Sequence, residues 1–239
     1  MPTSIHQPSF FPWLGLLDKI AKSDQFVFLD DVPANKASYQ YRNIFNCNGS
    51  IQTITLPVDY RMDRLIKDLQ FTNQSWKLAH LSKLKNYYLK APFFKETYYD
   101  VENLYLTSKS NRPVDFIIES MRYLFEVFQI SVQSCLSSSL NCTGNKGNLV
   151  LEICVKTGGT NYLSGRGAKN YMDDQLLNKF AESNIEVTWH QFKHPYYLQS
   201  DKYPFIEGLS ALDLLFFEGK ENANRIFWSN VNRNYDKAE

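Results

Sequence analysis

The sequence predicts an α/β fold, in which a mostly parallel sheet with flanking helices forms one domain over residues 1–239, with a mainly helical insertion at about 60–125. Three observations support this prediction. Short apolar runs bounded by acidic or glycine-rich turns are typical of buried strands. Segments with apolar residues at helical spacing separate these runs, as in parallel βαβ units. Finally, 239 residues can bury a full core, and neither a repeat nor a long linker divides them.

Charge balance and cysteine usage narrow the class of protein. Lys and Arg number 26 against 25 Asp and Glu, so electrostatics do not favour a dedicated nucleic-acid binder. The four cysteines form no CxxC pair and no signal peptide is recognisable, which favours a cytoplasmic protein with reduced thiols. The apolar stretch 10–17 is too short to span a membrane, so we expect no membrane insertion.

The first informative stretch follows the opening strand, which ends at Ile5. Residues 6–15 are too rich in proline and aromatics to be helix or strand. A helix is predicted from Leu16 and a buried strand over 25–29. In a parallel sheet this order places the 6–15 loop at the carboxyl edge of the first strand, where α/β folds bind ligands. The loop carries His6, Gln7 and Trp13, and the second strand is followed by the acidic pair Asp30 and Asp31.

A hairpin is predicted next. Asn48-Gly49 lies between two β-prone runs and signals a type I′ turn, and the second arm covers 51–58. Arg42 and Asn43 lie near the start of the first arm, and Lys36 precedes them. We consider Lys36, Arg42 and Asn43 as ligand-binding residues, with solvated surface cations as the alternative for Lys36 and Arg42.

An amphipathic helix is predicted over 74–89, with an apolar stripe formed by Leu78, Leu81, Leu84 and Tyr88. Further helices are predicted over 113–129 and 147–157, with a strand over 130–135. His80 is interpreted as a helix-face residue rather than a metal ligand. The serine-rich loop 136–146 could cradle an anion, but an ordinary polar loop is the favoured interpretation.

The second informative stretch is NYLSGRGAKNY, residues 161–171. A short strand ends at Ser164, a turn containing Gly165, Arg166 and Gly167 follows, and a helix is predicted over 172–182. Such glycines let the backbone approach a ligand, and Arg166 is suited to phosphate or carboxylate. We predict a second strand-end loop that faces the first, so that His6 and Gly165 share one cleft.

The last third of the chain is predicted to contain a strand over 184–192, a loop with His194, and a buried helix over 209–217. His190 is placed on a strand face, and no metal site is expected. Asp213 lies inside the apolar helix, so we expect it to bond a backbone group or a basic residue. Gly219 ends this helix, and after Lys220 we expect a polar tail that extends over the surface.

Stretches 5–32, 161–171, 194–199 and 205–216 resemble the WbqC-like proteins of bacterial surface-polysaccharide clusters. The resemblance implies an enzyme that modifies a nucleotide-linked amino sugar in O-antigen biosynthesis, by N-acyl or aminoacyl transfer. A weaker likeness concerns topology, because the strand, loop, helix and strand resemble the start of HUP-class or Rossmann-like nucleotide-binding folds. The HxGH motif of the HUP-class nucleotidyltransferases is absent, since Gln7-Pro8 follows His6.

The expected chemistry assigns His6 as the base that deprotonates the sugar amine, with Asp30 or Asp31 orienting His6 or binding the amine. Trp13 would stack on a ring, while Gln7 and Asn43 donate hydrogen bonds. The remaining predicted substrate-binding residues are Lys36, Arg42, Ser164, Gly165, Arg166, Gly167, Tyr171 and His194. No covalently bound cofactor is expected, and the acyl or aminoacyl donor, which a carrier could present, is unknown. The alternatives are a nucleotidyltransferase-like enzyme that uses ATP and a non-catalytic sugar-binding protein.

Overall fold

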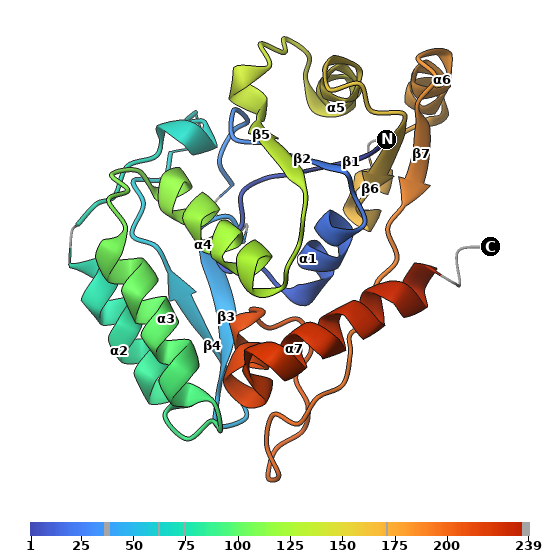
Figure 1. Ribbon diagram of the computed structural model, residues 1–239. Helices are drawn as coiled ribbons and strands as arrows, with labels where there is room; N and C mark the ends of the chain where they lie inside the picture. Colours follow the sequence, from blue (N-terminus) through green and yellow to red (C-terminus); the bar gives the residue numbers. More distant parts are fainter. Residues whose placement is uncertain (36–38, 62, 74, 171, 236–239) are drawn as a thin grey trace.

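The computed structural model describes residues 1–35, 39–61, 63–73, 75–170 and 172–235. A five-stranded sheet, in the order β5-β2-β1-β6-β7, forms its centre, and every neighbouring pair of strands is parallel (Figure 1). The strands are β1 (Pro2–His6), β2 (Gln25–Phe28), β5 (Gln133–Leu136), β6 (Asn161–Ser164) and β7 (Glu186–Trp189). The predicted α/β fold with a mostly parallel sheet is therefore confirmed.

The strand order reverses direction between β1 and β6. Counted along the chain, the sheet strands run 3-2-1-4-5, so the point of reversal is the topological switch point at which open α/β sheets bind ligands. The pairing of β1 with β6 is also short, because the two strands pair only at Pro2 with Asn161 and at Thr3 with Tyr162. Beyond Thr3, β1 continues to pair with β2, and β6 continues to pair with β7. A crevice therefore opens between their carboxyl ends. Assignment to the HUP class stays a prediction.

Helices cover both faces of the sheet (Figure 1). Phe26 and Phe28 of β2 point into a core shared with α1 (Leu14–Ala21) and α4 (Pro113–Val127). Val27, between them, points into the opposite core with α5 (Lys146–Lys156) and α6 (Asp174–Glu182). This alternation follows from the two-residue period of a strand and explains why the run is apolar throughout.

The chain between β2 and β5 forms a separate hairpin and a helical layer. Strands β3 (Arg42–Cys47) and β4 (Ser50–Thr55) pair antiparallel, and Asn48 and Gly49 both have positive φ (51° and 81°), as the predicted type I′ turn requires. The layer contains the 3₁₀ turn η1 (Ile66–Asp68), α2 (Trp76–Tyr88) and α3 (Phe94–Thr107).

The buried face of α2 differs from the predicted stripe. Leu78 is exposed, whereas His80 is buried and bonded on both ring nitrogens, with Nδ1 3.2 Å from the Tyr105 hydroxyl and Nε2 3.0 Å from the Thr55 carbonyl oxygen. Burial lowers the pKa of His80 to about 4, so the ring is neutral. His80 is therefore a hydrogen-bonded core residue.

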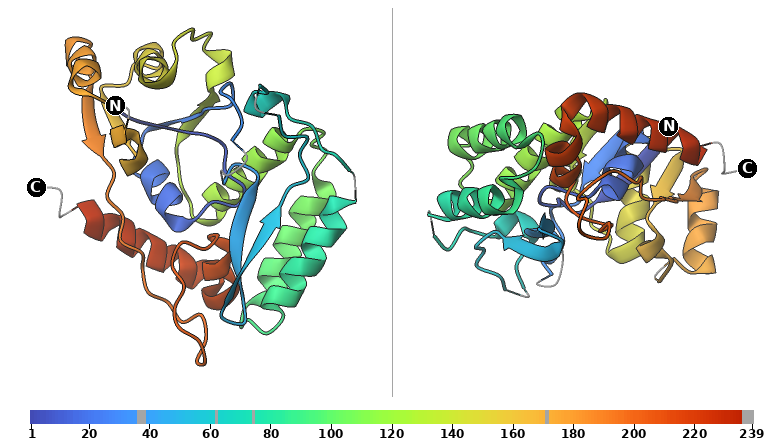
Figure 2. Two further views of the ribbon diagram at one scale, coloured as in Figure 1. Left: turned by 180° about the vertical axis from the view of Figure 1, so that it is seen from behind. Right: turned by 90° about the horizontal axis from the view of Figure 1, so that it is seen from below.

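The carboxyl-terminal segment is helical, so the prediction of a polar tail that extends over the surface is wrong. α7 (Leu212–Tyr235) bends at Gly219, whose φ of 68° lies in the left-handed region, and continues as a second helical piece. Ala223, Phe227 and Val231 recur at a spacing of four and are buried, and the helix runs across α1 and α3 (Figure 2). Among the described helices, none combines the length and the apolarity that a membrane span requires.

Asp213, at the start of α7, is completely buried and bonded to three side chains. Its Oδ1 accepts from the Tyr88 hydroxyl (2.8 Å), and its Oδ2 accepts from the Tyr197 hydroxyl and the Gln199 amide (both 2.9 Å). The prediction of a backbone or basic partner is wrong, because neutral donors from two distant segments satisfy the carboxylate.

Candidate functional site

A cleft of about 260 Å³ lies at the carboxyl ends of β1, β6 and β7, over the amino-terminal half of α1. It occupies the crevice at the switch point, and its lining combines two histidines, two cations and two aromatic rings. The lining residues are His6, Trp13, Gly15, Leu16, Lys19, Gly165, Arg166, His190 and Phe192. His6 and Gly165 thus face one cleft, as the geometric prediction requires.

His6 is the last residue of β1, and its imidazole opens onto the cleft. Its Nδ1 lies 2.7 Å from the Gln7 carbonyl oxygen, which can only accept, so Nδ1 carries the proton. Nε2 therefore presents its lone pair. The His6 side chain is exposed to solvent, while the protein atoms around it and the nearby charge of Lys19 lower its pKa to about 4. At neutral pH His6 is a neutral hydrogen-bond acceptor and a weak base.

His190 forms a pair with a buried carboxylate. It follows β7, and its backbone N–H donates to the Ser164 carbonyl oxygen at 2.8 Å, which fixes its position against β6. Its Nε2 lies 2.6 Å from Oδ1 of Asp18, which is fully buried in α1 and also accepts from Lys22 at 2.7 Å. Because Nε2 donates to the carboxylate, the neutral ring has its lone pair on Nδ1. A carboxylate that orients a histidine in this way is the arrangement found in nucleophilic hydrolases.

Lys19 lies next to Asp18 on α1 and is 4% exposed. Its ammonium donates to the Ile5 carbonyl oxygen at 3.0 Å, and among the described residues no carboxylate pairs with it. Burial lowers the pKa of Lys19 to about 8. A cation that is still mostly charged at neutral pH therefore lines the cleft without a counter-ion from the described part of the chain.

Trp13 and Phe192 form the aromatic wall. Their rings meet edge to face, with centroids 5.2 Å apart. The indole of Trp13 lies directly over Gly15, where an added Cβ would stand 2.3 Å from ring atom Cη2. Glycine in the first turn of α1 therefore makes room for the indole, and Trp13 remains 40% exposed.

Gly15→Ala is expected to displace the Trp13 ring while leaving the fold intact, because alanine suits a helix at least as well as glycine. The displaced indole should gain exposure, which acrylamide quenching of tryptophan fluorescence measures. Gly167→Ala is the matched control, since a Cβ there meets no atom within 4 Å. Unchanged quenching in Gly15→Ala would contradict the close packing.

The turn after β6 brings Gly165 and Arg166 to the cleft and turns Ser164 away from it. An added Cβ would meet nothing within 4 Å at Gly165 or Gly167, and neither has positive φ, so the fold alone does not require glycine there. Arg166 begins the 3₁₀ turn η3 (Arg166–Asn170) with an exposed side chain. Ser164 is buried, with its Oγ 3.8 Å from Sδ of Met172, and does not line the cleft.

Asp30 and Asp31 do not line the cleft. They bind the 3₁₀ turn η2 (Ser137–Ser139), where Asp30 accepts from the backbone N–H of Ser138 (3.0 Å) and its hydroxyl (2.8 Å). The Ser137 hydroxyl contacts both carboxylates. The serine turn considered for an anion therefore holds the protein's own carboxylates, and these tie β2 to the end of β5. We do not retain Asp30 and Asp31 as groups that orient His6 or bind the amine.

Asn43 also has a structural position. Its amide donates to the carbonyl oxygens of Phe10 (3.0 Å) and Phe11 (2.6 Å), and its Oδ1 accepts from the backbone of Ile44 (2.8 Å). Phe11 has φ of 39°, an uncommon value for a bulky residue, and is fully buried. Asn43 therefore holds the 6–15 loop in its strained shape instead of donating to a ligand.

The other predicted binding residues lie away from the cleft lining. Gln7 accepts a hydrogen bond from Gln40 at 2.7 Å, and Arg42 lies over the Tyr39 ring at 5.9 Å. His194 has its Nδ1 2.8 Å from the Pro195 carbonyl oxygen and packs against Phe192 and Phe205. Lys36 and Tyr171 lie outside the described residues. In the described part of the chain, no group of three or more His, Cys, Asp or Glu side chains could hold a metal ion.

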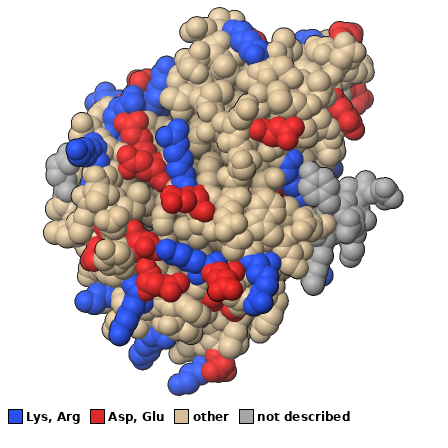
Figure 3. All heavy atoms as spheres, in the orientation of Figure 1, with Lys and Arg blue, Asp and Glu red and all other residues tan. Residues whose placement is uncertain are grey.

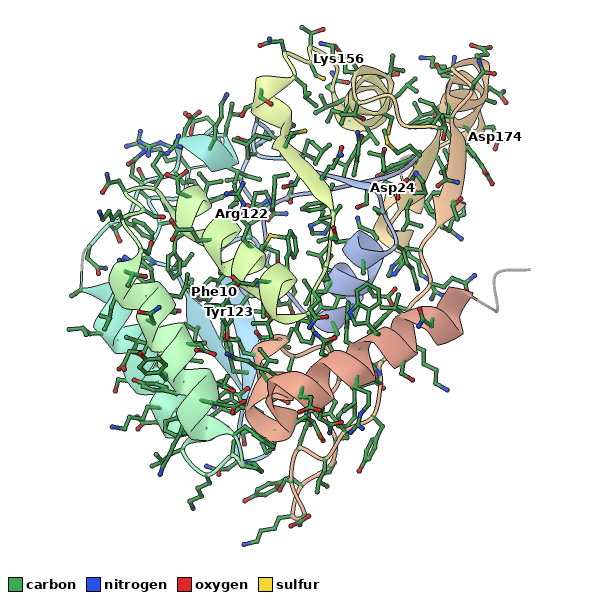
Figure 4. All side chains as sticks on the ribbon, in the orientation of Figure 1. Phe10, Asp24, Arg122, Tyr123, Lys156 and Asp174 are labelled. Carbon is green, nitrogen blue, oxygen red and sulfur yellow. The ribbon has the colours of Figure 1, made fainter. Side chains whose placement is uncertain are left out.

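A larger groove of about 1000 Å³ lies between α3, α4 and α7, where Arg122 and Tyr123 project from α4 (Figure 4). Acidic and basic side chains are interspersed on this face (Figure 3), and Asp100 pairs with Lys220 at 2.5 Å across the groove. The groove lies away from the carboxyl edge of the sheet, so we favour the cleft as the functional site.

Fold and cleft together define an α/β protein with a ligand-sized cleft at the switch point of a parallel sheet. The WbqC-like protein family model matches residues 7–225, and the chain belongs to this family. An uncharacterized protein of Mycobacterium tuberculosis is 27% identical over 220 residues, which are 91% of this chain and 94% of that protein. No solved structure matches the chain significantly.

Proposed function

We propose that the protein is a cytoplasmic enzyme that modifies a nucleotide-linked amino sugar for surface-polysaccharide biosynthesis by N-acyl or aminoacyl transfer to the sugar amine. The observation that carries this proposal is the His190–Asp18 pair, 2.6 Å apart, at the switch-point cleft. A histidine held by a buried carboxylate is suited to take a proton from a nucleophile at neutral pH. The resemblance of the sequence to proteins of surface-polysaccharide clusters supports the substrate class.

The general base in this proposal is His190, and His6 takes a different role. The partner of His6 is the Gln7 carbonyl oxygen, whereas a buried carboxylate, Asp18, orients His190, and the lowered pKa of His6 also makes it a poor base. Nε2 of His6 instead accepts a hydrogen bond from a hydroxyl or amine of the substrate. Trp13 and Phe192 pack against a sugar or base ring, and Gly165 leaves room for close approach of the substrate.

The proposed reaction balances as follows. The amine nitrogen forms a C–N bond to the acyl carbon, while the bond between that carbon and the donor's leaving group breaks. Nδ1 of His190 takes the amine proton and returns it to the leaving group, and Asp18 stabilises the imidazolium in between.

Mass spectrometry of the protein with nucleotide-linked amino sugars and candidate acyl donors tests the proposal. The expected product has gained the mass of the acyl group minus one hydrogen, which equals the mass of the parent acid minus water. An unchanged sugar with every donor tried would contradict the proposal, and ligand-induced thermal stabilisation without product would favour the non-catalytic sugar binder.

A nucleotidyltransferase-like enzyme is the second candidate, favoured by the 3-2-1-4-5 strand order, which many nucleotide-binding folds share. A pyrophosphate-release assay with ATP, Mg²⁺ and the same sugars distinguishes the nucleotidyltransferase from the acyl transferase, because adenylyl transfer releases pyrophosphate. Acyl transfer from a preformed donor proceeds without ATP and releases none.

A further inference from the structure

Lys19 is a buried ammonium with an incomplete set of partners. The group has three N–H donors, and the Ile5 carbonyl oxygen accepts one of them at 3.0 Å. The residue is 4% exposed and lines the cleft, where a ligand can supply the missing acceptors. A buried charge is costly unless it is paired.

Positive charge exceeds negative charge around Lys19. The ionisable groups that face it across the cleft are His6 and His190 at the ends of β1 and β7, and Arg166 after β6. On its own helix, the Asp18 carboxylate is shared between Lys22 and His190. One carboxylate therefore faces the three cations Lys19, Lys22 and Arg166. Its Oδ1 binds Lys22 and His190, and its buried Oδ2 has no hydrogen-bond partner among the described residues.

We propose that Lys19 binds an anionic oxygen group of the ligand, a phosphate or a carboxylate, in the interior of the cleft. Arg166, whose exposed side chain has no hydrogen-bond or ion-pair partner among the described residues, binds the same ligand at the rim. This inference rests on the proposed function for the nature of the ligand, since a nucleotide-linked sugar carries a diphosphate. The Trp13 indole and the Phe192 ring then pack against the uncharged part of the ligand.

Isothermal titration calorimetry with UDP, uridine and glucuronate tests the inference on the wild-type protein and on Lys19→Met. UDP carries the diphosphate, uridine removes it, and glucuronate offers a carboxylate. The wild-type protein should bind UDP or glucuronate, and uridine more weakly than UDP. Lys19→Met should weaken binding of the anionic probe at least about tenfold, because a charge-assisted bond to a desolvated anion is lost. The probe whose binding depends on Lys19 identifies the anionic group of the ligand, a phosphate if it is UDP and a carboxylate if it is glucuronate.

Lys169→Met is the matched control. Lys169 is an exposed lysine of η3 that lies over the Trp189 ring at 5.1 Å and does not line the cleft, so its removal subtracts the same charge without touching the site. The affinity of Lys169→Met for the probes should equal that of the wild-type protein. Equal affinity in Lys19→Met and the wild-type protein, or no binding of either anion to the wild-type protein, would overturn the inference.

A pH series on the wild-type protein tests the same point without a substitution. The pKa of Lys19 is about 8 and that of His6 is about 4, so Lys19 loses its positive charge as pH rises from 7 to 9.5 while His6 stays neutral. Binding of the anion should weaken over this range and should be pH-independent in Lys19→Met, which keeps His190 and Lys22. A pH-independent affinity in the wild-type protein would contradict the inference.

Binding and turnover separate this inference from the proposed function. Lys19-dependent binding of an anion without acylated product would leave the anion site standing and remove the transferase. If Lys19→Met forms the acylated product equally well and with an unchanged KM, the transferase stands and the anion site at Lys19 is removed.

Discussion

His190→Gln should reduce turnover of the amino-sugar substrate by about 10²–10⁴-fold, the usual contribution of a positioned general base. The Gln amide can still donate to Asp18, as Nε2 of His190 does at 2.6 Å, so the buried carboxylate keeps a partner. The melting temperature should therefore stay close to that of the wild-type protein. The quantity to measure is kcat together with its dependence on pH.

His194→Gln is the matched control for this substitution. His194 follows four residues later, packs among aromatic rings and does not line the cleft. Its kcat should stay within a few-fold of the wild-type value. A kcat for His190→Gln within twofold of wild type would show that His190 is not the base.

Asp213→Ala should lower the free energy of unfolding by about 3–5 kcal/mol, the range seen when one partner of a buried charged network is removed. The substitution leaves the hydroxyls of Tyr88 and Tyr197 and the amide of Gln199 without their acceptor in a fully buried site. Urea denaturation measures the change. Asp174→Ala, at an exposed position in the first turn of α6, is the control and should cost less than about 1 kcal/mol.

The same carboxyl makes stability depend on pH. Burial raises the pKa of Asp213 from 3.8 to about 6, so between these values the folded protein binds more protons than the unfolded chain. The contribution of Asp213 is most favourable below pH 4 and falls as pH rises through 6, by roughly 3 kcal/mol in total. Asp213→Asn should remove this dependence, so its stability relative to wild type should improve between pH 4 and 7. A constant difference across that range would contradict the raised pKa.

Local patterns were sufficient for much of the fold. Apolar runs between turn signals placed the five parallel strands to within a few residues, and Asn48-Gly49 placed the hairpin, because both depend on properties of neighbouring residues. The second half of α7 was missed because most of its residues are polar. The sequence signal for this helical segment was the spacing of four between Ala223, Phe227 and Val231, which form a narrow buried stripe.

The candidate site was predictable only in part, because strand-end loops can be placed from sequence order but side-chain partners cannot. His6, Trp13, Gly165 and Arg166 do line one cleft. Asp30 lies at the correct edge of the sheet, but it binds serines more than 100 residues away. The amide of Asn43 is likewise used by the loop it was expected to assist.

Asp18, Lys19 and His190 were missed for the same reason. Asp18 and His190 are 172 residues apart in the sequence, so no local motif contains both. The available signal was the acid and base at positions 18 and 19 inside the apolar run of α1, where ionisable groups are costly unless the tertiary structure gives them partners.

The central claim is that the cleft between β1, β6 and β7 binds a nucleotide-linked amino sugar. A crystal structure of the protein soaked with such a sugar tests it most directly. We predict ligand density between Trp13, Arg166 and His190, with an anionic group within hydrogen-bonding distance of Lys19. Density in the groove between α3, α4 and α7, near Arg122, with the cleft empty, would contradict the account.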